Sequence, residues 1–319
     1  MSADSLSDII PRLASKFPAD WWLAFPPNLT ALIAIVLVSV ICGSIGSLVV
    51  SNRMAFFSDA LAHCAFAGVT LGMLMSLASF RSGSEAWVVP TFMVAFGMLV
   101  GLAIAYVREK TSLASDTVIG VFFAFAVGLG AMLLNTLRRS SYMDPEKFLF
   151  GSLYSIEQRD LWILVGLVLV LAIVLLRSYN SIVLGSFNAS LARSRGVRVR
   201  FWNYMFILLL ALIVNLCLKA VGALLINSLL VVPAATAANL GRSIRAMFWW
   251  AISVGLAAGI VGVWMSFRVQ IPVPHGDPID LIPSGTIVEL CVAAFLASLI
   301  VRIRRDRRIS QVIANPVTA

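Results

Sequence analysis

Charged side chains are scarce in this sequence, and so are the residues that build disulfides and stable metal clusters. Charged residues make up only 12% of the 319 positions and hydrophobic residues 60%, whereas soluble domains carry about 25% charged residues. There are two histidines and four cysteines, and every cysteine falls inside an apolar run without a C-x-x-C partner. The shortage of charge excludes a soluble protein, and the cysteines, without C-x-x-C spacing, are most simply packing residues that do not indicate a redox compartment.

A nucleotide site and a nucleic-acid surface are missing as well. The one lysine followed by Ser or Thr is Lys110, and Glu109 rather than glycine precedes it, so the chain has no phosphate-binding loop. No basic face with interleaved aromatic residues stands outside the apolar runs, so the net charge of +9 does not indicate nucleic-acid binding. If this chain takes part in an energy-requiring process, the energy comes from another polypeptide or from an ion gradient.

Long apolar runs are what the sequence has in plenty. The mean hydropathy is +0.96, and the runs repeatedly reach the length of about 20 residues that a helix needs to cross a bilayer. We predict an all-α, polytopic transmembrane helical bundle. Its nine spans lie at about 29–50, 58–79, 87–107, 116–137, 161–177, 201–218, 220–240, 246–267 and 284–303.

The chain is expected to have three parts. These are an amphipathic interfacial segment at 1–28, a transmembrane domain at 29–305 and a cytoplasmic tail at 306–319. The first part ends in a Trp21-Trp22 pair, which is typical of a membrane-interface anchor. No cleavable signal peptide is expected, because the first apolar run leads into further spans.

Lysine and arginine residues predict the orientation, because short cytoplasmic loops carry an excess of them. With nine spans and an extracytoplasmic N-terminus, 15 of the 24 basic residues fall on the inner side. Most acidic residues fall on the outer side, which is then nearly neutral. The Arg138-Arg139 pair on the outer side is the weak point of this assignment. We therefore predict an extracytoplasmic N-terminus and a cytoplasmic C-terminus.

The second apolar run begins with the polar residues of greatest interest, Asp59 and His63. Four residues apart on a helix, they share one face, whereas Cys64 points elsewhere. An acid at membrane depth usually faces a cavity or a partner rather than lipid. The pair is either an Asp–His hydrogen bond that holds two helices together or a transient site for a divalent metal, since both side chains are ordinary ligands of zinc, manganese and ferrous iron.

Two loops carry further candidates. Residues 185–197 are predicted to form a short helix on the inner face, with Asn188 as its cap, Gly196 as its stop and an apolar edge at Phe187 and Leu191. A helix held at the interface by anionic lipid is the alternative. The outer loop 270–280 is rich in proline and contains His275 and Asp277, for which solvation is a simpler interpretation than metal binding.

Two acids remain near membrane depth, Asp116 and Glu289. Asp116 opens the fourth predicted span and Glu289 lies within the ninth. We expect each to serve as an interhelical hydrogen-bond partner or a helix-start acid rather than as a metal ligand.

Four segments carry a resemblance to a known family. Residues 53–69, R-M-A-F-F-S-D-A-L-A-H-C-A-F-A-G-V, are similar to its R-M-A-L-x-x-D-A-L-S-H-A-x-x-P-G-V. Residues 116–121 are similar to its D-T-A-I-G-I, residues 144–152 to its D-L-x-x-Y-L-F-G-N, and residues 223–237 follow its G-x-L-L-V-x-A-L-L-V-I-P-A-A-T-A from the second position on. In order and spacing these segments resemble the permease subunits of bacterial ABC importers for zinc, manganese and iron, over about residues 30–305.

The resemblance implies a multi-pass permease of the bacterial inner membrane that works as a homodimer. Two cytoplasmic ATPases would drive it and an extracytoplasmic metal-binding protein would feed it, with zinc, manganese or iron as cargo and no permanent cofactor. Asp59 and His63 would form a transient metal site. The segment that couples to the ATPase would include Phe187, Asn188, Leu191, Ala192, Arg195 and Gly196.

The sequence departs from the family pattern at three positions. Ala67 stands where the family has proline, so we expect a straighter second helix. Asn188 replaces an acid in the inner loop, which alters the expected contact with the ATPase. Asn227 places an amide in a usually apolar run.

Two other classes of function are weighed against a permease. An ion-coupled secondary carrier needs no ATPase, but no inverted repeat is visible in the sequence. ATP-independent uptake by this chain alone would favour it. An intramembrane metalloenzyme would use the same Asp59 and His63, but the sequence offers neither a second histidine nor a nucleophile at catalytic spacing.

Overall fold

The computed structural model describes residues 9–18, 21–78, 85–111, 113–137, 153, 156–187, 189–271 and 279–314. Nine helices in these residues are long and apolar enough to cross a membrane. They are α3 (Pro26–Ser51), α4 (Ala55–Ala78), α5 (Glu85–Lys110), α6 (Ser115–Leu137), α8 (Gln158–Phe187), α10 (Val199–Val221), α11 (Ala223–Leu240), α12 (Ile244–Arg268) and α13 (Pro283–Ala314). Each corresponds to one predicted span, so the predicted helical bundle is confirmed.

Short elements flank and connect these helices. They are α2 (Ile9–Ala14), the 3-10 helix η1 (Trp22–Ala24), α9 (Ala189–Ser194), β1 (Gln270–Ile271) and β2 (Ile279–Asp280). The two strands pair antiparallel, with Gln270 opposite Asp280. This two-residue ladder between α12 and α13 is the one element in the described residues that the all-α prediction does not contain.

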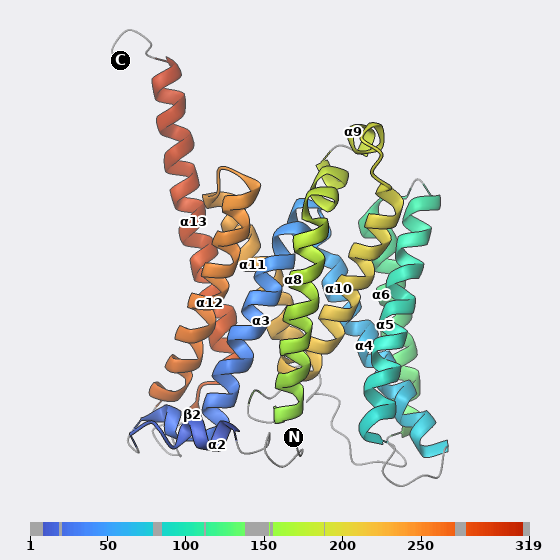
Figure 1. Cartoon of the computed structure of the whole chain (residues 1–319), viewed down its shortest axis with the longest axis vertical. Helices are drawn as coiled ribbons and strands as arrows, with labels where there is room; N and C mark the ends of the chain where they lie inside the picture. The colour runs from blue at the N-terminus through green and yellow to red at the C-terminus, as the bar shows by residue number, and fades with distance from the viewer. Residues whose placement is uncertain are drawn as a thin grey trace.

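The ends of the chain lie at opposite ends of the bundle. Figure 1 shows α2 at the bottom of the view, whereas α13 rises past the top, where α9 also lies. An odd number of spans requires such an arrangement. With α9 between the fifth and sixth spans, a nine-span bundle places α9 and the end of the last helix on the same side in either orientation.

Helix α3 packs closely against α11 and α12 through its glycines. A Cβ atom added at Gly43 would lie 2.8 Å from the Cα atom of Ile252 on α12, and one added at Gly46 would collide with the backbone carbonyl oxygen of Leu230 on α11. Small residues allow helix backbones to approach this closely in lipid. The position of α11 in the bundle therefore depends on the missing side chain at Gly46.

Helices α10 and α11 meet at a buried corner. Gly222 joins them with a φ of +85°, which glycine adopts without strain. The flanking Val221 and Ala223 are 0% and 4% exposed. Irregular backbone inside a membrane protein persists where protein or a polar cavity covers it. This corner sets the start of α11, and with it the position of Asn227 on the following turn.

Helix α4 runs unbroken from Ala55 to Ala78 and lies against α5 and α6. Ala67, where the resembled signature has proline, is fully buried within it. An alanine keeps the backbone N–H that proline lacks, so nothing interrupts the helical hydrogen bonds at this point. The first turns of α4, which carry Asp59 and His63, therefore belong to one uninterrupted helix.

Candidate metal site

Asp59 and His63 lie together on the first turns of α4. His63 Nδ1 is 3.6 Å from Asp59 Oδ1, with the Asp59 side chain 43% exposed and the His63 side chain 28% exposed. The i,i+4 spacing is the reason, since it stacks the two side chains along one face. Both groups are accessible from outside the packed core, as a site that takes up and releases an ion requires.

The backbone fixes the proton of the His63 ring. Nδ1 lies 3.0 Å from the backbone carbonyl oxygen of Asp59, which can only accept a hydrogen bond. Nδ1 is therefore the donor in this contact, and in the neutral tautomer that carries this hydrogen the lone pair lies on Nε2. The edge-to-face contact with Phe123 of α6, with ring centroids 4.8 Å apart, holds the imidazole in this orientation.

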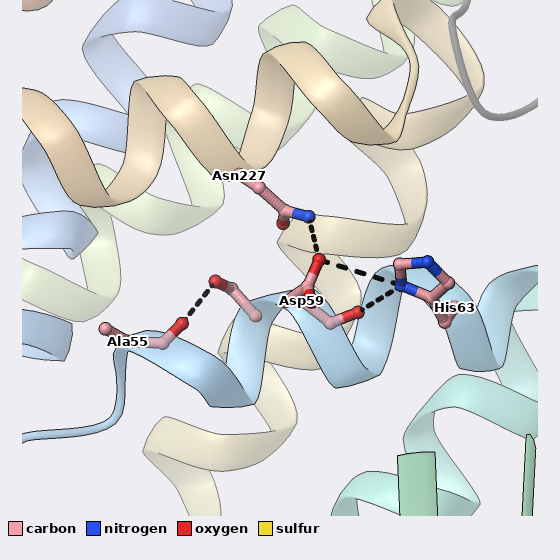
Figure 2. Close-up of polar contacts among 5 residues, drawn as sticks. Ala55, Asp59, His63 and Asn227 are labelled. Carbon is pink, nitrogen blue, oxygen red and sulfur yellow. Dashed lines mark hydrogen bonds and ion pairs between the residues drawn. The ribbon is translucent and has the colours of Figure 1, made fainter. Parts of the chain in front are cut away.

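A third polar side chain reaches the pair from another helix. Asn227 of α11 donates a hydrogen bond from Nδ2 to Asp59 Oδ1 at 2.6 Å, and Figure 2 shows the amide pointing at the carboxylate. Its other atom, Oδ1, is buried without a hydrogen-bond partner in the described structure. Sequence reasoning noted Asn227 only as an amide in an apolar run. The amide itself is visible in the sequence, but its role depends on the register of α4 against α11, which the sequence does not show.

The other candidate ligands do not join this cluster. Asp116 is an exposed acid in the first turn of α6, and Glu289 is exposed on α13. Among the described residues, no group of three or more His, Cys, Asp and Glu side chains is placed to hold a metal. His275 and Asp277 lie outside the described residues. In the described part of the chain, the cluster around Asp59 thus consists of one carboxylate, one imidazole and one amide.

The predicted inner-face segment contains a helix, α9, that covers Ala189–Ser194. Gly196 ends it with a φ of +75° and donates its N–H to the Arg193 carbonyl. Leu191 is 42% exposed and Ala192 is fully buried. Arg195 is exposed. Phe187 is the last residue of α8, so the span before this segment is longer than predicted, and Asn188 lies outside the described residues.

A basic cavity of about 1010 Å³ opens beside α9. Five arginines line it, namely Arg53, Arg108, Arg193, Arg198 and Arg200. Glu109 is the one acid in the lining, and it forms an ion pair with Arg200. The cavity therefore keeps an excess of positive charge, which suits an acidic surface.

Nine membrane-length helices in the described residues define a polytopic membrane protein, in which a carboxylate and an imidazole on α4 meet an amide of α11. The chain matches the ABC 3 transport family over residues 26–302 and belongs to that family. It is a multi-pass protein of a bacterial membrane with the permease fold, as predicted.

Individual relatives agree with this assignment. The manganese transport system membrane protein MntC of Halalkalibacterium halodurans is 31% identical over 254 residues, which cover 80% of this chain and 82% of the relative. The high-affinity zinc uptake system membrane protein ZnuB of Haemophilus influenzae is 30% identical over 245 residues, covering 76% and 88%. The solved structure of PsaBC from Streptococcus pneumoniae in complex with Fab superimposes with a TM-score of 0.67 at 25% identity, covering 85% of this chain and 90% of that one.

Proposed function

We propose that this chain is the membrane permease of an ATP-driven importer for a divalent transition metal ion. Manganese and zinc are the cargoes of similar proteins, MntC and ZnuB by their names, and iron was the third cargo that the sequence suggested. The observation that carries the proposal is that Asp59 and His63 share one partly exposed face of a membrane helix, with His63 Nδ1 3.6 Å from Asp59 Oδ1.

Each residue of the pair has a separate task in this proposal. The Asp59 carboxylate supplies the negative charge that draws a divalent ion out of water, and His63 adds Nε2 as a neutral ligand. Two ligands are fewer than the four that hold a structural zinc ion tightly. The half-exposed carboxylate lets the ion keep part of its water shell. Weak binding suits transit, since an ion held too firmly does not leave.

Energy and cargo come from partners in this proposal. Two copies of the chain pair with two cytoplasmic ATPases, and an extracytoplasmic binding protein delivers the ion. The exposed Leu191 of α9 is the apolar contact for the ATPase. The arginines of the neighbouring cavity favour acidic groups on the ATPase surface. The ion-coupled carrier has no support from the family or the relatives.

The test is metal uptake by the importer reconstituted in liposomes with its ATPase and binding protein. We expect Asp59→Ala and His63→Ala to lower ATP-dependent uptake of manganese or zinc by about tenfold or more, the usual scale for disturbing a metal site. Assembly with the ATPase, checked by co-purification, stays unchanged. Glu289→Gln, which removes an exposed acid from another span, is the matched control and keeps full uptake.

Normal uptake by both Asp59→Ala and His63→Ala would contradict the assignment of the site. Uptake by this chain without ATP or ATPase would contradict the assignment of the class, and would favour the ion-coupled carrier instead.

A further inference from the structure

The two polar atoms of the Asn227 side chain differ in their contacts. Nδ2 bonds the one carboxylate of the site at 2.6 Å. Oδ1 is buried and receives no hydrogen bond from the described residues. Buried polar atoms are nearly always paired, so an orphaned acceptor beside a proposed ion site requires an explanation.

The Asp59 contact alone decides which way the amide faces. Nitrogen and oxygen of an asparagine amide are nearly equal in shape, and a half-turn about the last side-chain bond exchanges them. No hydrogen bond at Oδ1 is lost in that turn, because none is present. The reversed amide, however, would set Oδ1 against the Asp59 carboxylate, where two oxygens repel each other. The amide therefore stays as it is until a positive charge comes between the two oxygens.

A divalent cation supplies that charge. Carboxylate and amide carbonyl oxygens are both hard ligands, and they suit manganese better than zinc. We propose that Asn227 is a third ligand of the ion site, which donates Nδ2–H to Asp59 while the site is empty and turns Oδ1 to the ion when it is occupied. This inference rests on the proposed function.

The consequence is selectivity within this chain. Asp59 and His63 alone offer one oxygen and one nitrogen ligand, which zinc, manganese and ferrous iron all accept. An added amide oxygen favours an ion that prefers oxygen donors and a larger coordination number. Asn227 therefore shifts the permease toward manganese, in addition to any selection by the binding protein.

Three variants of the full importer complex in lipid nanodiscs and liposomes test this, with Mn²⁺ and Zn²⁺ as probes. Asn227→Leu removes the donor and the oxygen, and we expect a fall of about tenfold in Mn²⁺ affinity and uptake with a smaller fall for Zn²⁺. Asn227→Asp keeps an oxygen ligand without the donor and retains Mn²⁺ uptake. Asn135→Leu, which removes an exposed amide from α6, is the control and changes neither ion.

A spectroscopic readout separates ligation from mere positioning. In protein labelled with ¹³C at the asparagine amides, Mn²⁺ binding is expected to shift one side-chain carbonyl band in the infrared difference spectrum, and Asn227→Leu removes that band. An unchanged Mn²⁺ to Zn²⁺ ratio in Asn227→Leu would overturn the inference. So would an Asn227→Asp protein that assembles but is as inactive as Asn227→Leu, since the donor alone would then matter.

Failure of this inference differs from failure of the proposed function. If Asp59→Ala loses uptake while Asn227→Leu behaves like the wild type, the site stands and the third ligand falls. If Asp59→Ala transports normally, the site itself is wrong, whatever Asn227→Leu does.

Discussion

Removal of Lys219 tests how charge is held inside this bundle. Lys219 Nζ lies 2.7 Å from Asp160 Oδ1, and the two side chains are 32% and 10% exposed. The pair ties the start of α8 to the end of α10, just before the buried corner that positions α11. Lys219→Met keeps most of the side-chain volume and leaves the Asp160 carboxylate buried without its counter-ion.

The size of the effect follows from this burial. Breaking a buried ion pair by removing one partner costs about 3–5 kcal/mol of stability. Asp160 lies in the first turn of α8, where the helix dipole favours an acid, and Lys219 keeps partial contact with solvent. We therefore expect Lys219→Met to cost about 2–3 kcal/mol, which corresponds to about 3–5 °C in thermal denaturation of a chain of this length. Size-exclusion chromatography of heated, detergent-solubilised protein measures this loss.

The double variant Asp160→Asn, Lys219→Met separates the pair from the packing of its side chains. A neutral pair of similar volume leaves no buried charge, so we expect the double variant to recover to within about 1 kcal/mol of the wild type. A double variant as unstable as Lys219→Met would refute the reasoning, because the loss would then come from packing and not from an uncompensated carboxylate.

Two further predictions follow from single contacts. Gly46→Val would push its side chain into the Leu230 carbonyl of α11, so we expect a loss of about 1–3 kcal/mol and reduced uptake, while Gly166→Val, which meets no atom within 4 Å, melts and transports like the wild type. Equal melting temperatures of Gly46→Val and Gly166→Val would contradict the close approach of α3 to α11. Leu191→Asp places a charge on the exposed edge of α9, and we expect co-purification with the ATPase to weaken by about tenfold, a loss of about 1.4 kcal/mol, with Leu191→Met as control. Retained binding by Leu191→Asp would place the ATPase contact elsewhere.

The hydrophobic runs predict the helices well because a lipid-embedded segment satisfies its backbone within itself. The ends are less predictable. Helix α8 was expected to end near Arg177 but continues to Phe187. Its added turns contain a second apolar run, Ile182-Val183-Leu184, and Ile182 is buried in the core. Helix α13 likewise continues through its arginines to Ala314. Hydropathy marks where lipid ends and does not mark where the helix ends.

The sequence alone predicts the contact between Asp59 and His63 but not the contact between Asp59 and Asn227. The Asp59–His63 contact is local, since helical periodicity brings them together wherever the helix lies. The contact between Asp59 and Asn227 is not local, because it depends on the close approach at Gly46 and on the corner at Gly222. No periodicity within one helix specifies the register of α4 against α11.

Pulsed electron paramagnetic resonance can ask directly whether the transported ion touches His63. The chain contains two histidines, so labelling the histidines of this chain alone with ¹⁵N leaves two possible sources of ¹⁵N modulation on bound Mn²⁺. In the importer complex assembled from this labelled chain and unlabelled partners, we predict ¹⁵N modulation that persists in His275→Gln and disappears in His63→Gln. Nitrogen modulation that survives in His63→Gln would contradict the account.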